Sequence, residues 1–277
     1  MSRSPLWAAN PLVLKAGYSF DVPRPLTDLA SWTTSTEWPR TACPICFVGS
    51  VGYEKSNQTP DVESQETLAI ASLREVRPEE LSGTFNGTLL CDNSTCRAQL
   101  SMAGDWAYSW DVSDEGYTRL FNLYRVRFVT PPLRLFVPPE RTPQKVKDEI
   151  IAAASVLFVS PSAAGNRLRR AVEELLDTQG IRKTRNGTKA LNKRVRMTLH
   201  DRIKEFGMTR PDVEKVLLAV KWIGNDASHG QEFVVADVVL CAEVLEAALK
   251  SLYDRRDAEL LAIVSRINAR KGLGKRK

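Results

Sequence analysis

The sequence lacks any long apolar segment and contains few histidines. No apolar run reaches the roughly 18 residues that a membrane-spanning helix needs, so we expect no membrane association. The first ten residues also lack the long apolar core of a signal peptide, and we therefore expect a cytoplasmic protein. With only two histidines in the chain, imidazole chemistry is restricted to His200 and His229. We interpret His200 as a surface residue of a basic amphipathic helix.

The composition is that of an ordinary soluble globular protein. The chain has 277 residues, of which 43% are hydrophobic and 26% are charged. A chain of this length buries a substantial core and forms one large domain or two moderate ones. No internal repeat is apparent.

Positive charge is concentrated in the second half of the chain. Residues 138–277 contain 27 Lys and Arg against 18 Asp and Glu, whereas acidic residues predominate in 1–137. The basic residues cluster in 182–204 and again in 270–277. Such clusters bind phosphate backbones, and they also occur as solvated loops and tails. Both interpretations stay open, and Arg194 and Arg196 are candidate nucleic-acid contacts.

Residues 1–135 are rich in strand signals and poor in helical ones. Prolines interrupt the first forty residues, which favours extended or looped chain. Short alternating or apolar segments predict strands at 67–73, 87–90, 99–102, 106–110 and 120–129. The dipeptide Asn86-Gly87 predicts a hairpin turn.

Four of the five cysteines form two pairs, Cys43-Pro-Ile-Cys46 and Cys91-Asp-Asn-Ser-Thr-Cys96. Two thiolate pairs joined by antiparallel strands supply the tetrahedral four-sulfur shell that Zn²⁺ favours, and we predict a structural zinc site at these four residues. The forty-four residues between the pairs imply an inserted hairpin or loop. Disulfides and a redox-active pair are the alternatives. Cys241 lies in an apolar helical run and is predicted to be buried.

A proline-rich bridge separates two halves of different character. Prolines occur at 131, 132, 138, 139 and 143, and helices cannot continue across them. We place the boundary near residue 138, which predicts a β-rich four-cysteine module in 1–137 and an α-helical bundle with a basic tail in 138–277.

The second half shows helical periodicity and recognisable helix starts. Ser160-Pro161 and the capping box at Thr198 and Asp201 are start signals. We predict helices over about 142–158, 160–180, 198–206, 209–223, 234–252 and 257–270. Residues 182–196 are predicted to form a loop or mobile insertion. The fourth helix is expected to stop at Gly224. This glycine lies within the polar stretch Lys221-Trp-Ile-Gly-Asn-Asp-Ala-Ser-His229, which we call the polar turn.

The segment order in 138–254 resembles the family called domain of unknown function 4145. The resemblance rests on Ala163-Ala164, the run Arg169-Arg-Ala-Val-Glu-Glu-Leu-Leu176, the segment Leu199-His-Asp-Arg-Ile203 and Ile223-Gly-Asn-Asp-Ala-Ser-His229. Members of that family often carry a paired-cysteine zinc module in front of the helices, and they occur beside anti-phage defence components. The resemblance further implies a helical bundle of the HEPN superfamily.

Active HEPN ribonucleases use an Arg, a polar residue and a His, with two such motifs meeting across a dimer interface. Their chemistry is independent of metal ions. In this chain Asn225 and His229 match the polar and His positions, whereas Gly224 stands where the Arg would be. Arg169, Arg170 or Lys221 would then have to supply the missing charge.

Two interpretations of the polar turn follow. In the catalytic one, His229 is the acid or base, Asn225 orients it, and Arg170 or Lys221 stabilises the phosphate. In the structural one, Asn225 caps the helix end and His229 bonds to Glu173 or a backbone carbonyl. Arg169 and Arg170 likewise either contact nucleic acid or neutralise Glu173, Glu174 or a neighbouring helix. We favour the structural interpretation because a lone histidine with a displaced arginine is weak evidence for catalysis.

The sequence therefore predicts an α+β protein with a zinc-ribbon-like module followed by a HEPN-like bundle. We expect a non-catalytic or accessory binding protein that recognises a partner, a nucleic acid or a nucleotide, plausibly in prokaryotic defence. The alternative is a dimeric HEPN-type endoribonuclease. The implied cofactor is Zn²⁺, and the implied partners are a second copy, RNA or DNA, and a defence-system protein.

Overall fold

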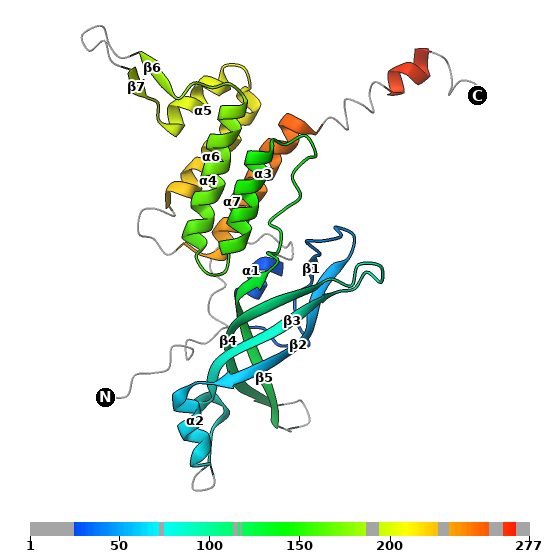
Figure 1. Cartoon of the computed structure of the whole chain (residues 1–277), viewed down its shortest axis with the longest axis vertical. Coiled ribbons are helices and arrows are strands. Elements are labelled where there is room, and N and C mark those ends of the chain that lie inside the picture. The colour runs from blue at the N-terminus through cyan, green and yellow to red at the C-terminus, as the bar shows by residue number, and fades with distance from the viewer. Residues whose placement is uncertain are drawn as a thin grey trace. The chain divides into compact units, whose positions relative to one another are not determined.

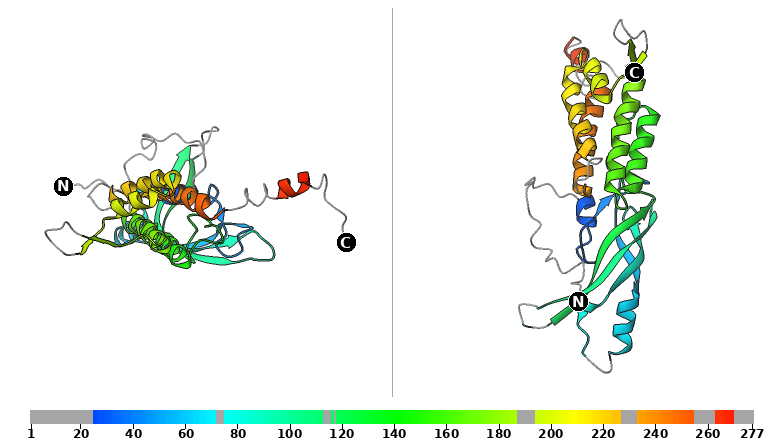
Figure 2. Two further views of the ribbon diagram at one scale, coloured as in Figure 1. Left: turned by 90° about the horizontal axis from the view of Figure 1, so that it is seen from above. Right: turned by 90° about the vertical axis from the view of Figure 1, so that its left-hand side faces the viewer.

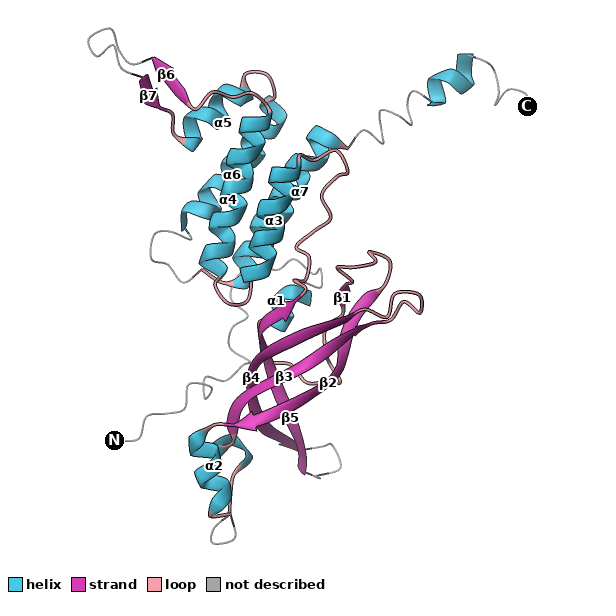
Figure 3. Ribbon diagram, in the orientation of Figure 1, coloured by secondary structure: helices cyan, strands magenta, loops and turns pink. Residues whose placement is uncertain are grey.

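The computed structural model describes residues 25–71, 75–112, 116, 118–186, 194–226, 233–254 and 263–269, with the backbone alone at 226. The chain divides into two compact units, Met1–Leu133 and Arg134–Lys277 (Figure 1). The proline-rich bridge placed the boundary near residue 138, and the division lies between Leu133 and Arg134. Strands are the main regular elements of the first unit and helices those of the second (Figure 3).

The first unit is built on a five-stranded antiparallel sheet whose strands follow one another in chain order. The strands are β1 (Thr41–Ala42), β2 (Ser50–Pro60), β3 (Ser82–Cys91), β4 (Gln99–Val112) and β5 (Thr118–Thr130). The helices are α1 (Pro25–Leu29), before the sheet, and α2 (Val62–Ala69) with the 3₁₀ turn η1 (Pro78–Glu80), both between β2 and β3.

Two local predictions for this unit were wrong. The segment 67–73 was expected to be a strand, but its described part continues α2 and a turn, because Asp61 caps that helix by accepting a hydrogen bond from Ser64 N–H. The dipeptide Asn86-Gly87 does not turn. It lies within β3, where Asn86 pairs with Asn57 on one side and Ala103 on the other. Pairing on both edges outweighs the local turn preference of the dipeptide.

Aromatic side chains fill the core of the sheet. Tyr124 and Phe85 are each 2% exposed, and their ring centroids lie 5.0 Å apart in an edge-to-face arrangement. Trp38 and Tyr53 pack against the same tyrosine. The buried hydroxyl of Tyr124 accepts a hydrogen bond from Gln58 at 2.7 Å. Edge-to-face packing of this kind adds to the stabilisation from apolar burial.

The second unit is a bundle of five labelled helices with a small two-stranded ribbon. The helices are α3 (Gln144–Val156), α4 (Pro161–Thr178), α5 (Leu199–Gly207), α6 (Pro211–Asp226) and α7 (Val235–Tyr253). The ribbon consists of β6 (Thr184–Asn186) and β7 (Arg194–Arg196). Residues 263–269 are also helical. The helix α3 packs along α4, and α6 packs along α7 (Figure 2).

The helix α4 is the centre of this bundle, since it contacts α3, α5, α6 and α7. Its apolar stripe is fully buried, at Leu168, Ala171, Val172, Leu175 and Leu176. The predicted start signals are confirmed: Ser160 accepts from Ala163 N–H, and Thr198 and Asp201 form a reciprocal capping box. Cys241 is buried as expected, and burial raises its thiol pKa to about 12.

Two expectations for the second unit are corrected. The helix α6 does not stop at Gly224 but continues through Asn225 to Asp226. A methyl group on Gly224 would come within 3.2 Å of Arg169 Cβ, so the glycine permits close packing of α6 on α4, which offsets its low helix propensity. The stretch 182–196 is not a plain loop either, because its two ends pair as β6 and β7.

A glycine on β4 offers a stability test of the sheet. A methyl group at Gly104 would lie 2.1 Å from the Arg125 carbonyl oxygen and 2.8 Å from Phe85 Cε1. We expect Gly104→Ala to lower the free energy of unfolding by about 1–3 kcal/mol, since this overpacking forces the backbone apart. Chemical denaturation measures the change, with the exposed Ser101→Ala on the same strand as the control. Equal stability of the two variants would contradict the packing described.

Candidate metal centre and basic surfaces

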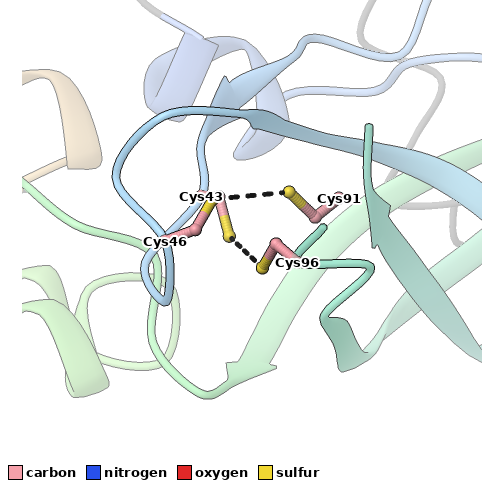
Figure 4. Close-up of side chains that lie close together, drawn as sticks. All are labelled: Cys43, Cys46, Cys91 and Cys96. Carbon is pink, nitrogen blue, oxygen red and sulfur yellow. Dashed lines mark hydrogen bonds between the residues drawn. The ribbon is translucent and has the colours of Figure 1, made fainter. Parts of the chain in front are cut away.

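Two loops at one end of the sheet present the four predicted metal ligands. Cys43 and Cys46 lie in the connection between β1 and β2, whereas Cys91 ends β3 and Cys96 lies in the connection to β4. The pairing of β2 with β3 sets Val51 opposite Cys91, and this register brings the loops together. The side chains of all four cysteines converge on one point (Figure 4).

The sulfur positions fit one tetrahedral metal ion. All four Sγ atoms lie within 4.8 Å of one another, with Cys43 and Cys96 at 4.0 Å and Cys46 and Cys91 at 3.7 Å. Four sulfurs that each lie about 2.3 Å from a zinc-sized ion are separated by roughly 3.8 Å. A disulfide requires about 2.05 Å, and the cysteines are free thiols. The cluster can therefore hold a metal ion.

The backbone of each loop is shaped for this convergence. The residue after the second cysteine of each pair adopts a left-handed conformation, with φ of 62° at Phe47 and 47° at Arg97. In the first loop Gly49 N–H then donates to Cys46 Sγ at 3.4 Å. A methyl group at Gly49 would lie 2.8 Å from Cys91 Sγ. Only glycine fits this position without displacing a ligand.

A polar brace that the sequence did not reveal joins the two cysteine loops. The carboxylate of Asp92 accepts hydrogen bonds from Ser50 N–H and Ser50 Oγ, both at 2.8 Å. Arg40 forms an ion pair with the same carboxylate at 2.9 Å. The hydroxyl and amide of Ser50, together with Arg40, hold the pKa of Asp92 below its usual value. The brace fixes the second loop against the first independently of any ion.

The thiols of the cluster differ in acidity. Hydrogen bonds from the backbone N–H groups of Gly49 and then Val48 lower the pKa of Cys46 to about 6. Burial, followed by its cysteine neighbours, raises the pKa of Cys91 to about 12. Metal ions bind thiolates, so ion uptake must release the protons of the less acidic thiols, and the affinity falls as the pH is lowered.

The two predicted arginines of α4 lie in different surroundings. Arg170 is an exposed side chain that pairs with Glu149 on α3 at 3.1 Å. Arg169 lies against Gly224 of α6 and approaches Glu173 at 3.8 Å. Only Arg169 of this pair therefore adjoins the helix that leads into the polar turn. Arg170 thus pairs with an acidic residue of a neighbouring helix, and its role in nucleic-acid binding stays a prediction.

The polar turn is only partly described. Lys221 and Asn225 lie on α6, with Lys221 Nζ 3.3 Å from the centroid of the Trp222 ring and Asn225 half-buried. His229 lies outside the described residues, so its predicted catalytic role stays a prediction. The proposed cap at Asn225 requires a helix end before Asp226, whereas α6 includes both residues.

The remaining predicted nucleic-acid contacts, Arg194 and Arg196, lie on β7, where both are exposed. Arg196 and Arg169 line the same pocket, which has a volume of about 580 Å³. Two further basic residues of this pocket, Lys183 and Arg202, were not singled out from the sequence. The register of β6 with β7 places Lys183 there, and the sequence carries no signal of that pairing.

Comparison with known families agrees with this division into units. Residues 151–270 match the family model described as Domain of unknown function (DUF4145). The second unit carries a DUF4145 domain. Residues 31–132, which include all four clustered cysteines, match the model described as Domain of unknown function (DUF8608). No curated protein and no solved structure matches the chain significantly.

The DUF4145 domain and the cysteine cluster confirm the resemblance drawn from the sequence, whereas membership of the HEPN superfamily stays a prediction. Among the helices that the structure describes, none has the length and apolarity needed to cross a membrane.

Substitution of one cysteine tests the cluster as a metal site. We expect Cys43→Ser to abolish retention of about one equivalent of metal ion and to unfold the first unit, because the ion stabilises only the folded cluster. The DUF4145 domain should keep its helical circular dichroism. Elemental analysis and circular dichroism measure the two effects, with the buried Cys241→Ala as a cysteine control that keeps its metal. Loss of the helical signal in Cys43→Ser would show that the two units unfold together.

Proposed function

We propose that the protein is a non-catalytic nucleic-acid-binding protein with a structural zinc ion in its first unit. The observation that carries the proposal is the ribbon formed by β6 and β7 in the DUF4145 domain. Its strands pair antiparallel, and every residue of both strands is exposed. Arginines occupy positions 185, 194 and 196, and no acidic residue occurs between 182 and 196.

A two-stranded ribbon of this kind has dimensions that fit a nucleic-acid groove. Arginine side chains contact the phosphates, and the release of counterions supplies affinity that does not depend on base sequence. Thr184 pairs with Arg196 at the base of the ribbon. Arg185 pairs with Val195, and Asn186 pairs with Arg194. Arg194 and Arg196 therefore share one face of the ribbon, and Arg185 lies on the other face, so both faces carry positive charge.

Zinc is the proposed occupant of the cysteine cluster. Four thiolates fill the tetrahedral shell of Zn²⁺ and leave no open position for a substrate. The role is consequently structural rather than catalytic. A four-thiolate zinc site is compatible with a reducing compartment such as the cytoplasm, where disulfides are rare.

The ribbon hypothesis has a direct test in binding measurements at several salt concentrations. We expect Arg185→Ala and Arg194→Ala each to weaken binding of mixed-sequence RNA or DNA, and to reduce the steepness of the logarithmic salt dependence by about one phosphate contact. Fluorescence anisotropy measures both quantities. Lys215→Ala, which removes an exposed basic side chain on α6, is the matched control. If Lys215→Ala changes binding as much as the ribbon variants, the ribbon is not the contact surface.

A metal-independent endoribonuclease is the second candidate, and the resemblance of Asn225 and His229 to the HEPN motif supports it. Such an enzyme would act as a dimer, since two motifs meet across an interface. The same resemblance supports a place in anti-phage defence, with a protein of a defence system as partner.

Incubation of purified protein with mixed RNA separates these two functions. We expect no cleavage by the wild type, because Gly224 occupies the position of the motif's arginine. Denaturing gel electrophoresis detects any products, with His229→Ala as the comparison. Cleavage by the wild type that disappears in His229→Ala would establish the nuclease and overturn the non-catalytic proposal.

A further inference from the structure

The strongest unexplained feature of the DUF4145 domain is a charged pocket at the base of the ribbon. It has a volume of about 580 Å³ and lies between α4, β7 and the first turn of α5. The hydrogen bond from Met197 N–H to the Lys183 carbonyl, at 2.9 Å, holds the ribbon base beside it. Four basic side chains from four segments line the pocket: Arg169, Lys183, Arg196 and Arg202.

Arg202 is the most unusual of these residues because its charge is buried. It is 6% exposed, and its guanidinium bonds to Asp177 Oδ1 at 2.5 Å and to the Ile181 carbonyl at 3.1 Å. Its Nε atom is buried without a hydrogen-bond partner among the described residues. A buried guanidinium that is held rigidly at the wall of a pocket is well suited to a ligand with several acceptor oxygens.

Arg169 contributes a second guanidinium, from the α4 side of the pocket. Its Nε atom is also buried without a partner in the described chain, and its nearest carboxylate, Glu173, lies 3.8 Å from its terminal nitrogen. Arg196 forms no ion pair with any described residue. Three guanidinium groups therefore line one pocket.

The acidic residues of the pocket do not cancel this positive charge. Lys183 and Arg202 share the carboxylate of Asp177. Burial raises the pKa of Asp177, but the hydrogen bonds from Lys183 and Arg202 outweigh it and hold the value below the usual range. Asp177 is thus ionised, and it is paired with the side chains of both Lys183 and Arg202. Glu173 also lines the pocket and lies 3.8 Å from Arg169. Glu174 forms no ion pair within the described part of the chain, and it is the unpaired acid that opposes an anion.

We propose that this pocket binds a phosphate monoester, as found at the end of a nucleic-acid strand or on a free nucleotide. A monoester carries close to two negative charges and three terminal acceptor oxygens, whereas an internal phosphodiester carries one charge and two such oxygens. Several guanidinium groups around one pocket match the monoester better. The proposal rests on the proposed function in that Arg196 belongs to both the ribbon and the pocket.

Oligonucleotides of one sequence with a 5′-phosphate, a 3′-phosphate or only hydroxyl ends test the assignment. We expect one phosphorylated end to bind the wild type roughly tenfold more tightly than the hydroxyl ends, as charge-assisted hydrogen bonds predict. Arg169→Gln should remove this preference, whereas Glu174→Gln should increase it by removing the opposing charge. Arg194→Ala, on the ribbon but outside the pocket, should weaken all three strands and keep the preference.

The outcomes separate this inference from the proposed function. Salt-dependent binding without any end preference, or a preference unchanged in Arg169→Gln and Glu174→Gln, would overturn the pocket and leave the ribbon hypothesis standing. If no strand binds, while a nucleoside monophosphate raises the melting temperature of the wild type but not of Arg169→Gln, the pocket binds a free phosphate ester and the proposed function is wrong. If neither strands nor nucleotide bind, both fall.

Discussion

The convergence of four cysteine sulfurs is the constraint on which the first unit depends. Its sheet is a single layer of five strands, and without the sulfur cluster the loops at the cysteine end are held by a few hydrogen bonds and the Asp92 brace. Glycine at 49 and the left-handed residues at 47 and 97 shape the loops for these sulfurs. The aromatic cluster around Tyr124 stabilises the sheet apart from this end. The unit thus combines a candidate metal site with an apolar core.

The second unit depends instead on α4, whose two faces serve different purposes. Its buried stripe contacts four other helices, and its polar side presents Arg169, Glu173 and Asp177 to the charged pocket. The buried pair of Arg202 and Asp177 joins α5 to the same helix. A pair of this kind tolerates the loss of one partner poorly, because the remaining charge stays buried. The residues that bind α5 to α4 are thus also residues of the proposed site.

Sequence patterns were most informative where the determining interactions are local. The cap at Ser160 and the capping box at Thr198 depend on neighbours three residues away. The two cysteine pairs are likewise recognisable from the short separation within each pair. Predictions were wrong where distant partners decide the structure. Asn86-Gly87 is drawn into β3 by strands on both sides, and Gly224 stays helical because α4 packs against it. Likewise, Arg169 and Arg196 line one pocket because of the pairing of β6 with β7, which the sequence does not reveal.

The spacing of the cysteine pairs has a consequence for how the first unit assembles. Cys46 and Cys91 are 45 positions apart, so an ion that joins them closes a large loop in the unfolded chain. On the chain-entropy treatment used for disulfides, closing a loop of this size removes roughly 4 kcal/mol of conformational freedom from the unfolded state. The antiparallel pairing of β2 with β3 closes the same loop. If either event occurs first, strand pairing or ion binding, the entropic cost of the other is lower. Strand pairing and ion binding would therefore be thermodynamically cooperative.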